Sequence, residues 1–96
     1  MNEKAQAIEN QILKGMPGWQ IKYQYAGHLH KFRIEGKDST HWLYVSHELL
    51  DDSEPVILIN LVNIYHIVDT LHKAEKSKWL FMGHDGLREV DENFAK

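Results

Sequence analysis

The clearest pattern in the chain is a strict alternation of apolar and polar residues over positions 19–25. A period of two predicts a strand with one buried side. The alternation resumes over 28–34, after a two-residue turn that we place at Ala26 and Gly27. This turn predicts a hairpin in which paired residue numbers add to 53, so that Tyr25 faces His28. One side of the hairpin then collects eight residues: Trp19, Ile21, Tyr23, Tyr25, His28, His30, Phe32 and Ile34.

A third strand is predicted over residues 41–46, after a turn-rich segment. Its register depends on the length of the loop before it. A loop of four residues directs Leu43 and Val45 to the buried side of the hairpin. Trp42 and Tyr44 then share the other side with the basic residues of the first two strands. One residue more or less in the loop reverses both assignments.

A short N-terminal helix is predicted over residues 3–14, because Ala5, Ile8 and Ile12 recur at helical spacing. Gly15 favours the end of this helix.

A much longer helix is predicted to run to about Lys76, after a short helical turn at 46–52. Ser53 is available to cap it, and Pro55 is tolerated in a first turn. Its broad apolar side includes residues spaced four and three apart: Ile57, Leu61, Ile64, Val68 and Leu71. A competing interpretation makes 56–59 a short strand, because β-branched residues are frequent there.

Two more strands are predicted at 78–82 and 87–90, joined through an Asp-Gly turn signal at 84–86. Residues 91–96 are expected to be a frayed tail unless Phe94 docks on the domain. The chain therefore ends in a second hairpin.

These elements follow the order αβββαββ and predict an α+β fold, with an antiparallel sheet packed on one long and one short helix. Residues 1–96 form a single domain, since no linker is long enough to separate two. The first five elements are similar in order to those of a double-stranded-RNA-binding domain. The second helix, however, begins beside Asp51, Asp52 and Glu54 instead of a lysine cluster, so we assign no family from the sequence.

Composition narrows the classes of function. The 96 residues are 43% hydrophobic and 26% charged with a net charge of −3, which excludes disorder as the main state. The chain has no cysteine, so disulfides, thiol nucleophiles and cysteine-ligated zinc are excluded. The polar start lacks the pattern of a secretory signal, and no apolar run approaches the ~20 residues of a membrane span. We therefore expect a cytoplasmic protein without a membrane partner.

Candidate catalytic groups are few. Ser46, His47 and Glu48 include the residue types of a hydrolytic triad, but consecutive residues cannot face one another as a triad requires. The acidic pairs at 51–52 and 91–92 lie in polar stretches with no apolar pocket to shift a pKa. No glycine-rich loop joins a strand to a helix. We expect no enzymatic activity and no cofactor.

Seven histidines are the oddest feature of the composition. His28 and His30 form a His-x-His pair, a spacing that can place two imidazoles on one metal ion. We prefer the alternative that both rings pair across the hairpin with Tyr25 and Tyr23. A third ligand would come from one of three residues among which no spacing selects: His41, His47 and His84. We therefore expect no metal site, and rank a histidine-based metal protein or enzyme third.

The polar side of the first hairpin carries Lys22, Lys31 and Arg33. If the third strand adds Trp42 and Tyr44, aromatic rings lie among cations there. Such surfaces hold single-stranded nucleic acid by base stacking and phosphate contacts. The net charge of −3 argues against this function, since nucleic-acid-binding domains are usually basic. Nucleic-acid binding is therefore the alternative function.

The long helix favours a different partner. Its apolar side is wider than one small sheet covers, so we expect the excess to lie against a second copy of the chain, with the N-terminal helix as the alternative cover. The candidate interface residues are Ile57, Leu61, Ile64 and Val68. We expect a small regulatory or accessory protein of a bacterium that acts through protein–protein contacts as a homodimer.

Overall fold

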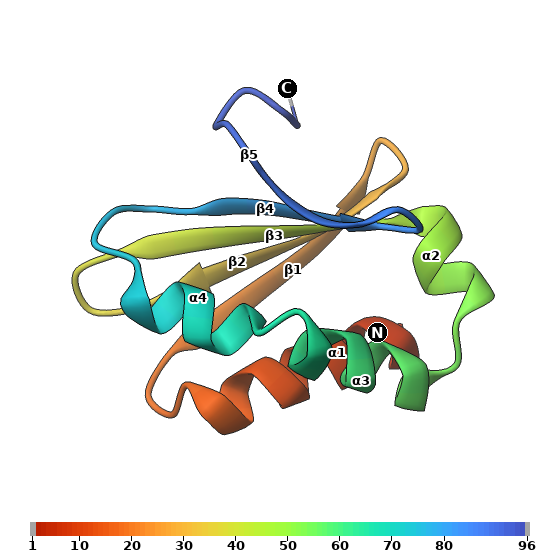
Figure 1. Cartoon of the computed structure of the whole chain (residues 1–96), viewed down its shortest axis with the longest axis horizontal. Coiled ribbons are helices and arrows are strands. Elements are labelled where there is room, and N and C mark those ends of the chain that lie inside the picture. The colour runs from red at the N-terminus through yellow and green to blue at the C-terminus, as the bar shows by residue number, and fades with distance from the viewer. Residues whose placement is uncertain (1, 96) are drawn as a thin grey trace.

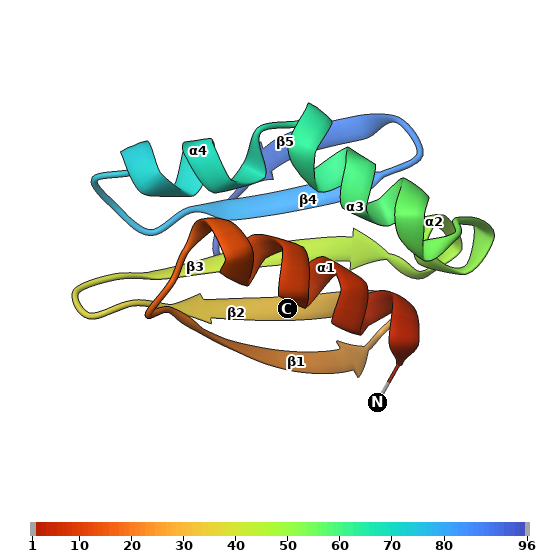
Figure 2. The same ribbon diagram turned by 90° about the horizontal axis from the view of Figure 1, so that it is seen from below.

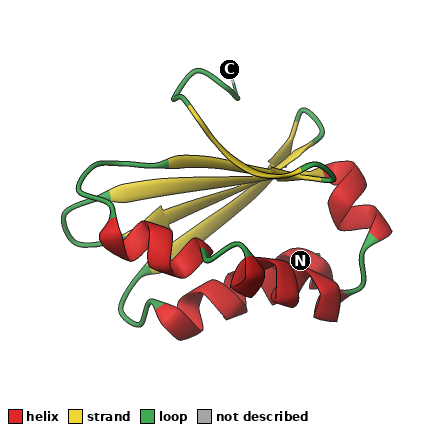
Figure 3. Cartoon of the chain, viewed as in Figure 1, coloured by secondary structure: helices red, strands yellow, loops and turns green. Residues whose placement is uncertain are grey.

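Four helices and five strands follow one another in the order αβββαααββ in this computed structural model, which describes residues 2–95 (Figure 1). The helices of the described chain all lie on one side of the sheet (Figure 3). The α+β class expected from the sequence is confirmed. The elements are α1 Glu3–Gly15, β1 Gln20–Ala26, β2 Leu29–Glu35, β3 Thr40–Ser46, α2 His47–Asp52, α3 Pro55–Ile64, α4 Ile67–Lys73, β4 Trp79–Gly83 and β5 Gly86–Val90.

The strands lie side by side in the order β1-β2-β3-β4-β5 (Figure 2). β1, β2 and β3 are antiparallel neighbours, β4 runs parallel to β3, and β5 returns antiparallel to β4. The sheet is therefore mixed, and the expectation of a purely antiparallel sheet is wrong. A parallel neighbour needs a crossover connection, which the segment containing α2, α3 and α4 supplies.

The turn between β1 and β2 lies at Gly27 and His28, one residue later than expected. Gly27 has a φ of 60° and His28 a φ of 63°, and two left-handed residues give the two-residue turn whose twist suits a hairpin. Paired residue numbers therefore add to 55, and Tyr25 faces His30 instead of His28. The expected partners are wrong by two positions. Because this shift is even, every strand side chain stays on its expected side.

A four-residue loop at 36–39 joins β2 to β3. Arg33 pairs with Trp42, and Lys31 pairs with Tyr44. The chain therefore adopts the four-residue alternative considered from the sequence. Side chains of the third strand alternate accordingly between the buried side and the side that carries the cations.

The helix expected as a single element up to residue 76 is broken in two. α3 ends before His66, which adopts a left-handed φ of 54°, and α4 starts directly after it. A left-handed residue ends a helix because it turns the backbone out of the helical path. Pro55 begins α3 as expected, but Ser53 ends α2 and does not cap α3. The strand alternative for 56–59 is also wrong.

The core lies between the helices and the side of the sheet that faces them, which we call the inner face. In Figure 2, α1 runs across the β2–β3 part of the sheet, while α3 and α4 lie on the side of β4. The inner face contributes buried side chains from three strands: Phe32, Ile34, Leu43, Val45, Leu80 and Met82. The helices contribute a matching set: Ile8, Ile12, Leu58, Val62, Ile67 and Leu71. Over residues 2–95, no helix combines the length and the apolar character needed to cross a bilayer.

Candidate functional site

The side of the sheet that faces away from the helices, which we call the outer face, is the richest candidate surface. Cross-strand pairing arranges its central side chains in two rows. The first row from β1 to β5 is Lys22, Arg33, Trp42, Trp79 and Val90. The second row is Gln24, Lys31, Tyr44, Phe81 and Arg88. The five residues singled out from the sequence as a basic and aromatic surface are therefore brought together on one face.

Aromatic rings form a continuous layer on the outer face. Ring centroids lie 6.3 Å apart for Trp42 and Tyr44, and 5.8 Å apart for Tyr44 and Phe94. Phe94 also packs 5.1 Å from Phe81, so the alternative in which Phe94 docks on the domain holds for the described residues 91–95; residue 96 lies outside the described residues. Tyr44 is 4% exposed, and this burial raises the pKa of its hydroxyl. The layer is thus partly covered by the chain itself.

Cations of the outer face differ in how they are paired. Arg33 donates two hydrogen bonds to a Glu35 carboxylate oxygen, at 3.1 and 2.7 Å, and Lys22 Nζ lies 3.5 Å from the other oxygen. These hydrogen bonds from Arg33 are the main reason that the pKa of Glu35 lies below its usual range. Within residues 2–95, no carboxylate lies within 4.0 Å of the charged nitrogens of Lys31 or Arg88.

Arginine side chains also lie over the rings. The Arg33 guanidinium is 5.7 Å from the Trp42 centroid. The Arg88 guanidinium is 5.3 Å from the Phe81 centroid and 5.4 Å from that of Phe94. These distances fall within the range of cation–π attraction. Arg88 therefore packs against Phe81 and Phe94, with no carboxylate of residues 2–95 within 4.0 Å of its guanidinium nitrogens.

Two shallow hollows flank Trp42, with volumes of about 360 and 370 Å³. Gln24, Lys31 and Trp42 line both of them. Towards the end of the chain the first hollow is closed by Glu92 and Ala95. A ligand that spans the two hollows would meet the shared Trp42 and Lys31. It would also meet Trp79 in the first hollow, and Lys22 and Arg33 in the second.

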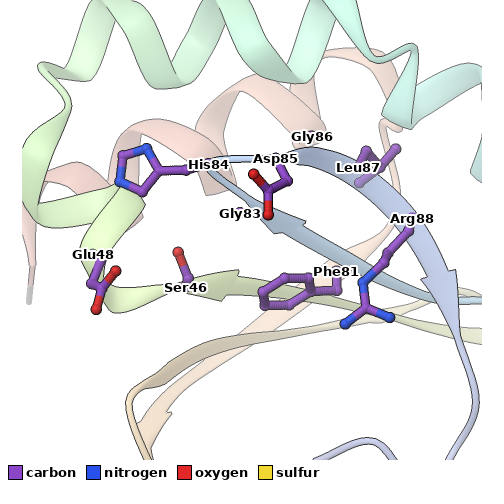
Figure 4. Close-up of a pocket in the computed structure, with 9 residues that line it drawn as sticks. All are labelled: Ser46, Glu48, Phe81, Gly83, His84, Asp85, Gly86, Leu87 and Arg88. Carbon is purple, nitrogen blue, oxygen red and sulfur yellow. The ribbon is translucent and has the colours of Figure 1, made fainter.

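A further hollow of about 300 Å³ lies between the end of β3 and the β4–β5 turn (Figure 4). Two of its polar side chains, Ser46 and His84, already contact other groups of the protein. Ser46 Oγ accepts a hydrogen bond of 3.1 Å from the Leu49 amide and so caps α2. His84 Nε2 lies 3.2 Å from Asp52 Oδ2, and Figure 4 places His84 and Arg88 at opposite ends of the hollow. The nucleophile and base types found here do not converge on one point.

A chain of hydrogen bonds crosses the inner face near the β1–β2 turn. Tyr23 Oη lies 2.6 Å from His30 Nδ1, and His30 Nε2 lies 3.0 Å from His47 Nδ1. The ring of Tyr25 stacks on His30 with centroids 4.5 Å apart. His30 is 1% exposed, and its burial, followed by the nearby His47, lowers its pKa. Its imidazole is therefore neutral at neutral pH.

His28 and His30, the candidate metal ligands, do not share a strand side. His28 lies in the hairpin turn, while both ring nitrogens of His30 already contact other side chains. In the described part of the chain, no three histidine, aspartate or glutamate side chains are grouped so that they could hold a metal ion. The expected partners across the hairpin are wrong for both histidines, because His30 lies opposite Tyr25 and His28 lies in the turn. His30 keeps a contact with Tyr23 through the hydrogen bond of its ring.

His41 is a second buried histidine of the inner face. It is 0% exposed, its Nδ1 accepts a hydrogen bond of 3.1 Å from the Lys78 amide, and its ring stacks 5.6 Å from Trp19. Nε2 is buried without a hydrogen-bond partner within the described residues. Burial, and to a lesser extent Lys78, lowers the pKa of His41. The ring therefore acts as a neutral part of the core.

α3 is the second candidate surface. Three of its aliphatic side chains remain largely in solvent, with exposed fractions of 59% for Val56, 45% for Ile57 and 64% for Ile64. Leu61 lies on the same side of the helix but is half-buried against the core. Val68, the fourth residue considered for an interface, packs against α1, because a methyl group placed on Gly15 would lie only 2.7 Å from its Cγ1.

Sequence reasoning missed half of the outer face. Trp79, Phe81, Arg88 and Phe94 join it from β4, β5 and the end of the chain. Trp79 and Phe81 flank Leu80 in the sequence, so the period of two in a strand places both rings on the side opposite Leu80. Only the parallel pairing with β3 shows that their side is the one that carries Trp42.

Comparison of the chain with protein-family models, with curated proteins and with solved structures finds no match to any of the three. A function is therefore inferred from the chain's own residues.

Proposed function

We propose that this protein is a non-catalytic interaction module that forms a homodimer through the exposed side of α3. The observation that carries the proposal is the solvent exposure of Val56, Ile57 and Ile64 on one short helix. Contiguous exposed apolar side chains on a small domain are typical of an interaction surface. Ser46 and His84 line one hollow and offer nucleophile and base chemistry, but Ser46 caps α2 and His84 contacts the Asp52 carboxylate, in support of a non-catalytic role.

A second copy of the chain fits this surface better than a charged partner does. α3 contains no charged residue, so two copies meet across a two-fold axis without like-charge repulsion. Asn60 lies midway between Val56 and Ile64 on the exposed side. A two-fold axis at Asn60 sets Val56 of one copy against Ile64 of the other. The two central amides then satisfy each other, because each carries a donor and an acceptor.

Sedimentation equilibrium at micromolar concentration tests the proposal. We expect a mass of twice 11.3 kDa for the native chain. Ile64→Asp should give a folded monomer, since the side chain is already 64% exposed in the free protomer and its change affects only the interface. Gln24→Asp on the exposed part of the outer face is the matched control and should remain dimeric. A native chain that sediments as a monomer up to millimolar concentration contradicts the proposal.

Leu61→Asp separates the interface from the core. Leu61 is half-buried and packs against core residues, so an aspartate there leaves a charge unpaired in an apolar environment. We expect this variant to lose both the dimer and the fold by circular dichroism, whereas Ile64→Asp loses only the dimer. Equal unfolding of both variants would show that the exposed side of α3 is needed for folding and not for association.

A further inference from the structure

The outer face has a charge opposite to that of the protein. It carries four cations, Lys22, Lys31, Arg33 and Arg88, and one acid, Glu35, a local charge of +3 on a chain of net charge −3. The other regions must therefore be acidic. A positive surface on a negative protein attracts anionic partners to one place and repels them elsewhere.

Residues 91–95 of the chain itself lie against the outer face and indicate the kind of segment that binds there. Residues 91–95 read Asp-Glu-Asn-Phe-Ala and turn back over the outer face (Figure 1). The turn is held by the Asp91 carboxylate, which accepts from the Asn93 amide at 2.9 Å, and by a 3.1 Å bond from the Phe94 amide to the Asp91 carbonyl. Phe94 enters the aromatic layer, and Glu92 lines the same hollow as Lys31. Acidic groups and one ring thus occupy a basic and aromatic surface.

Residues 91–95 leave two cations of the outer face without a carboxylate partner and one hollow uncovered. Lys31 and Arg88 have no carboxylate within 4.0 Å anywhere in residues 2–95, although both line hollows beside the docked segment. The hollow bounded by Lys22, Gln24 and Arg33 is lined by none of the residues 91–95. A longer segment of the same chemistry would satisfy the two cations and extend into this hollow.

We propose that the outer face binds an extended, acidic segment of a partner protein that carries an aromatic residue, and that residues 91–95 occupy part of this site in the free chain. The partner's ring takes the place of Phe94 between Tyr44 and Phe81. Its carboxylates pair with Lys31 and Arg88. This site is separate from α3, since the helices and the outer face lie on opposite sides of the sheet (Figure 3).

A protein segment suits this face better than single-stranded nucleic acid. Base stacking needs an open ring face, but Tyr44 is 4% exposed and the Arg33 guanidinium lies 5.7 Å from the ring of Trp42. Lys22 and Arg33 already share Glu35, so few cations remain for successive phosphates. A short segment with one ring and a few carboxylates needs no more than the two unpaired cations and the aromatic layer.

Fluorescence anisotropy with a labelled synthetic peptide that repeats residues 87–95 tests the proposal on full-length chains. Phe94→Ala should bind the peptide about tenfold more tightly than the native chain, because its own segment no longer competes. Lys31→Gln combined with Arg88→Gln should remove most of this binding at physiological salt. Lys14→Gln, at the exposed end of α1, is the matched control and should bind like its parent.

The peptide itself is varied in the same assay. Replacing its phenylalanine by alanine, or its acids by the corresponding amides, should each weaken binding several-fold. Binding that survives both changes, or no saturable binding to Phe94→Ala, overturns the proposal. An oligothymidine of equal charge that binds more tightly than the peptide also overturns it and favours nucleic acid. If Phe94→Ala fails to fold, the double variant Asp91→Asn and Glu92→Gln takes its place, because it weakens the segment's docking and keeps the ring.

A negative result in the peptide-binding assay does not contradict the proposed dimer through α3. The dimer is measured by mass and depends on Ile64, whereas peptide binding depends on Lys31 and Arg88. A chain that dimerises but binds no peptide therefore contradicts only the inference about the outer face.

Discussion

The inner and outer faces of the sheet are built from alternate residues of the same strands, yet they have different chemistry. The inner face is aliphatic and aromatic, and α1, α3 and α4 bury it. The outer face places aromatic rings among cations, and within the described chain only residues 91–95 fold back over it. Alternate side chains of one strand can therefore have different roles. Those on the inner face stabilise the core, and those on the outer face are available to bind a partner.

This difference leads to a simple expectation about energetics. The inner-face side chains of β2, β3 and β4 that form the core have lost nearly all of their water, so removing one leaves a cavity. Outer-face side chains keep part of their hydration, so removing one changes stability less and binding more. We therefore expect the largest losses of stability from buried side chains of the inner face and the smallest from exposed charges of the outer face.

Phe32→Ala should have the largest effect. Phe32 is 0% exposed on the inner face, and truncation of a buried phenylalanine costs about 3–5 kcal/mol of unfolding free energy. Phe81→Ala, at a half-buried position of the outer face, should cost about 1–2 kcal/mol because water fills the space. Urea-induced unfolding followed by circular dichroism measures both. Equal losses would show that the two faces are equally important for folding.

Acid should weaken the inner face through its two buried imidazoles. Burial lowers the pKa of His30 and of His41, so below about pH 6.5 the unfolded chain takes up protons that the folded chain does not. The free energy of unfolding then decreases as the pH is lowered, by at most about 1.4 kcal/mol per pH unit for each imidazole. It is regained as the pH rises back above that value.

Two measurements check this pH dependence. Urea midpoints should be lower at about pH 5.5 than at about pH 7.5. Ring-proton NMR follows the two imidazoles separately and should show both still neutral where an ordinary histidine is half-protonated. Titration of either ring above the usual histidine range contradicts the prediction.

Phe94→Ala should have a moderate effect that is confined to the outer face. Its ring makes contacts with Tyr44 and Phe81, and aromatic pairs contribute about 0.5–1.5 kcal/mol. We expect a loss of about 1 kcal/mol together with a shift in tryptophan emission, because Trp42 and Trp79 line the hollow that the segment closes. Unchanged emission would show that residues 91–95 do not cover these rings in solution.

Lys22→Gln should have the smallest effect. Its side chain is 65% exposed, and its ion pair with Glu35 spans 3.5 Å at the surface. Exposed ion pairs of this kind contribute about 0–1 kcal/mol, and salt weakens them further. A loss above 1 kcal/mol in urea unfolding would show that the outer face contributes to stability in the way that the inner face does.

Much of the sheet was predictable because alternation in a strand is a local property of the sequence. The apolar positions alone predict which side chains of β1 and β2 face the core. This prediction is correct even though the expected pairing was wrong by two residues. The turn itself was not predictable, because His28 adopts a left-handed φ that glycine or asparagine usually takes. The composition of the outer face was predictable only as far as β3, which a short loop ties to β2.

The features of the fold and of the candidate surfaces that could not be predicted depend on contacts between residues far apart in the sequence. Apolar spacing across 57–71 continues as in a single helix, and the break at His66 leaves no proline or glycine to mark it. Nothing local reveals that β4 pairs in parallel with β3, so Trp79 could not be assigned to the face of Trp42. The exposure of Ile64 likewise depends on how α3 packs and not on its sequence.

The parallel pairing of β3 and β4 has a consequence for the order of folding. Leu43 pairs with Leu80, 37 positions further along, whereas β1, β2 and β3 are joined by loops of only a few residues. Closing a long segment is entropically more demanding, so we expect the three-stranded meander to form early and the β4–β5 hairpin to add last. That final step delivers Phe81 and Arg88. The outer face is then complete only on a chain that has finished folding, and incompletely folded or nascent chains do not present it.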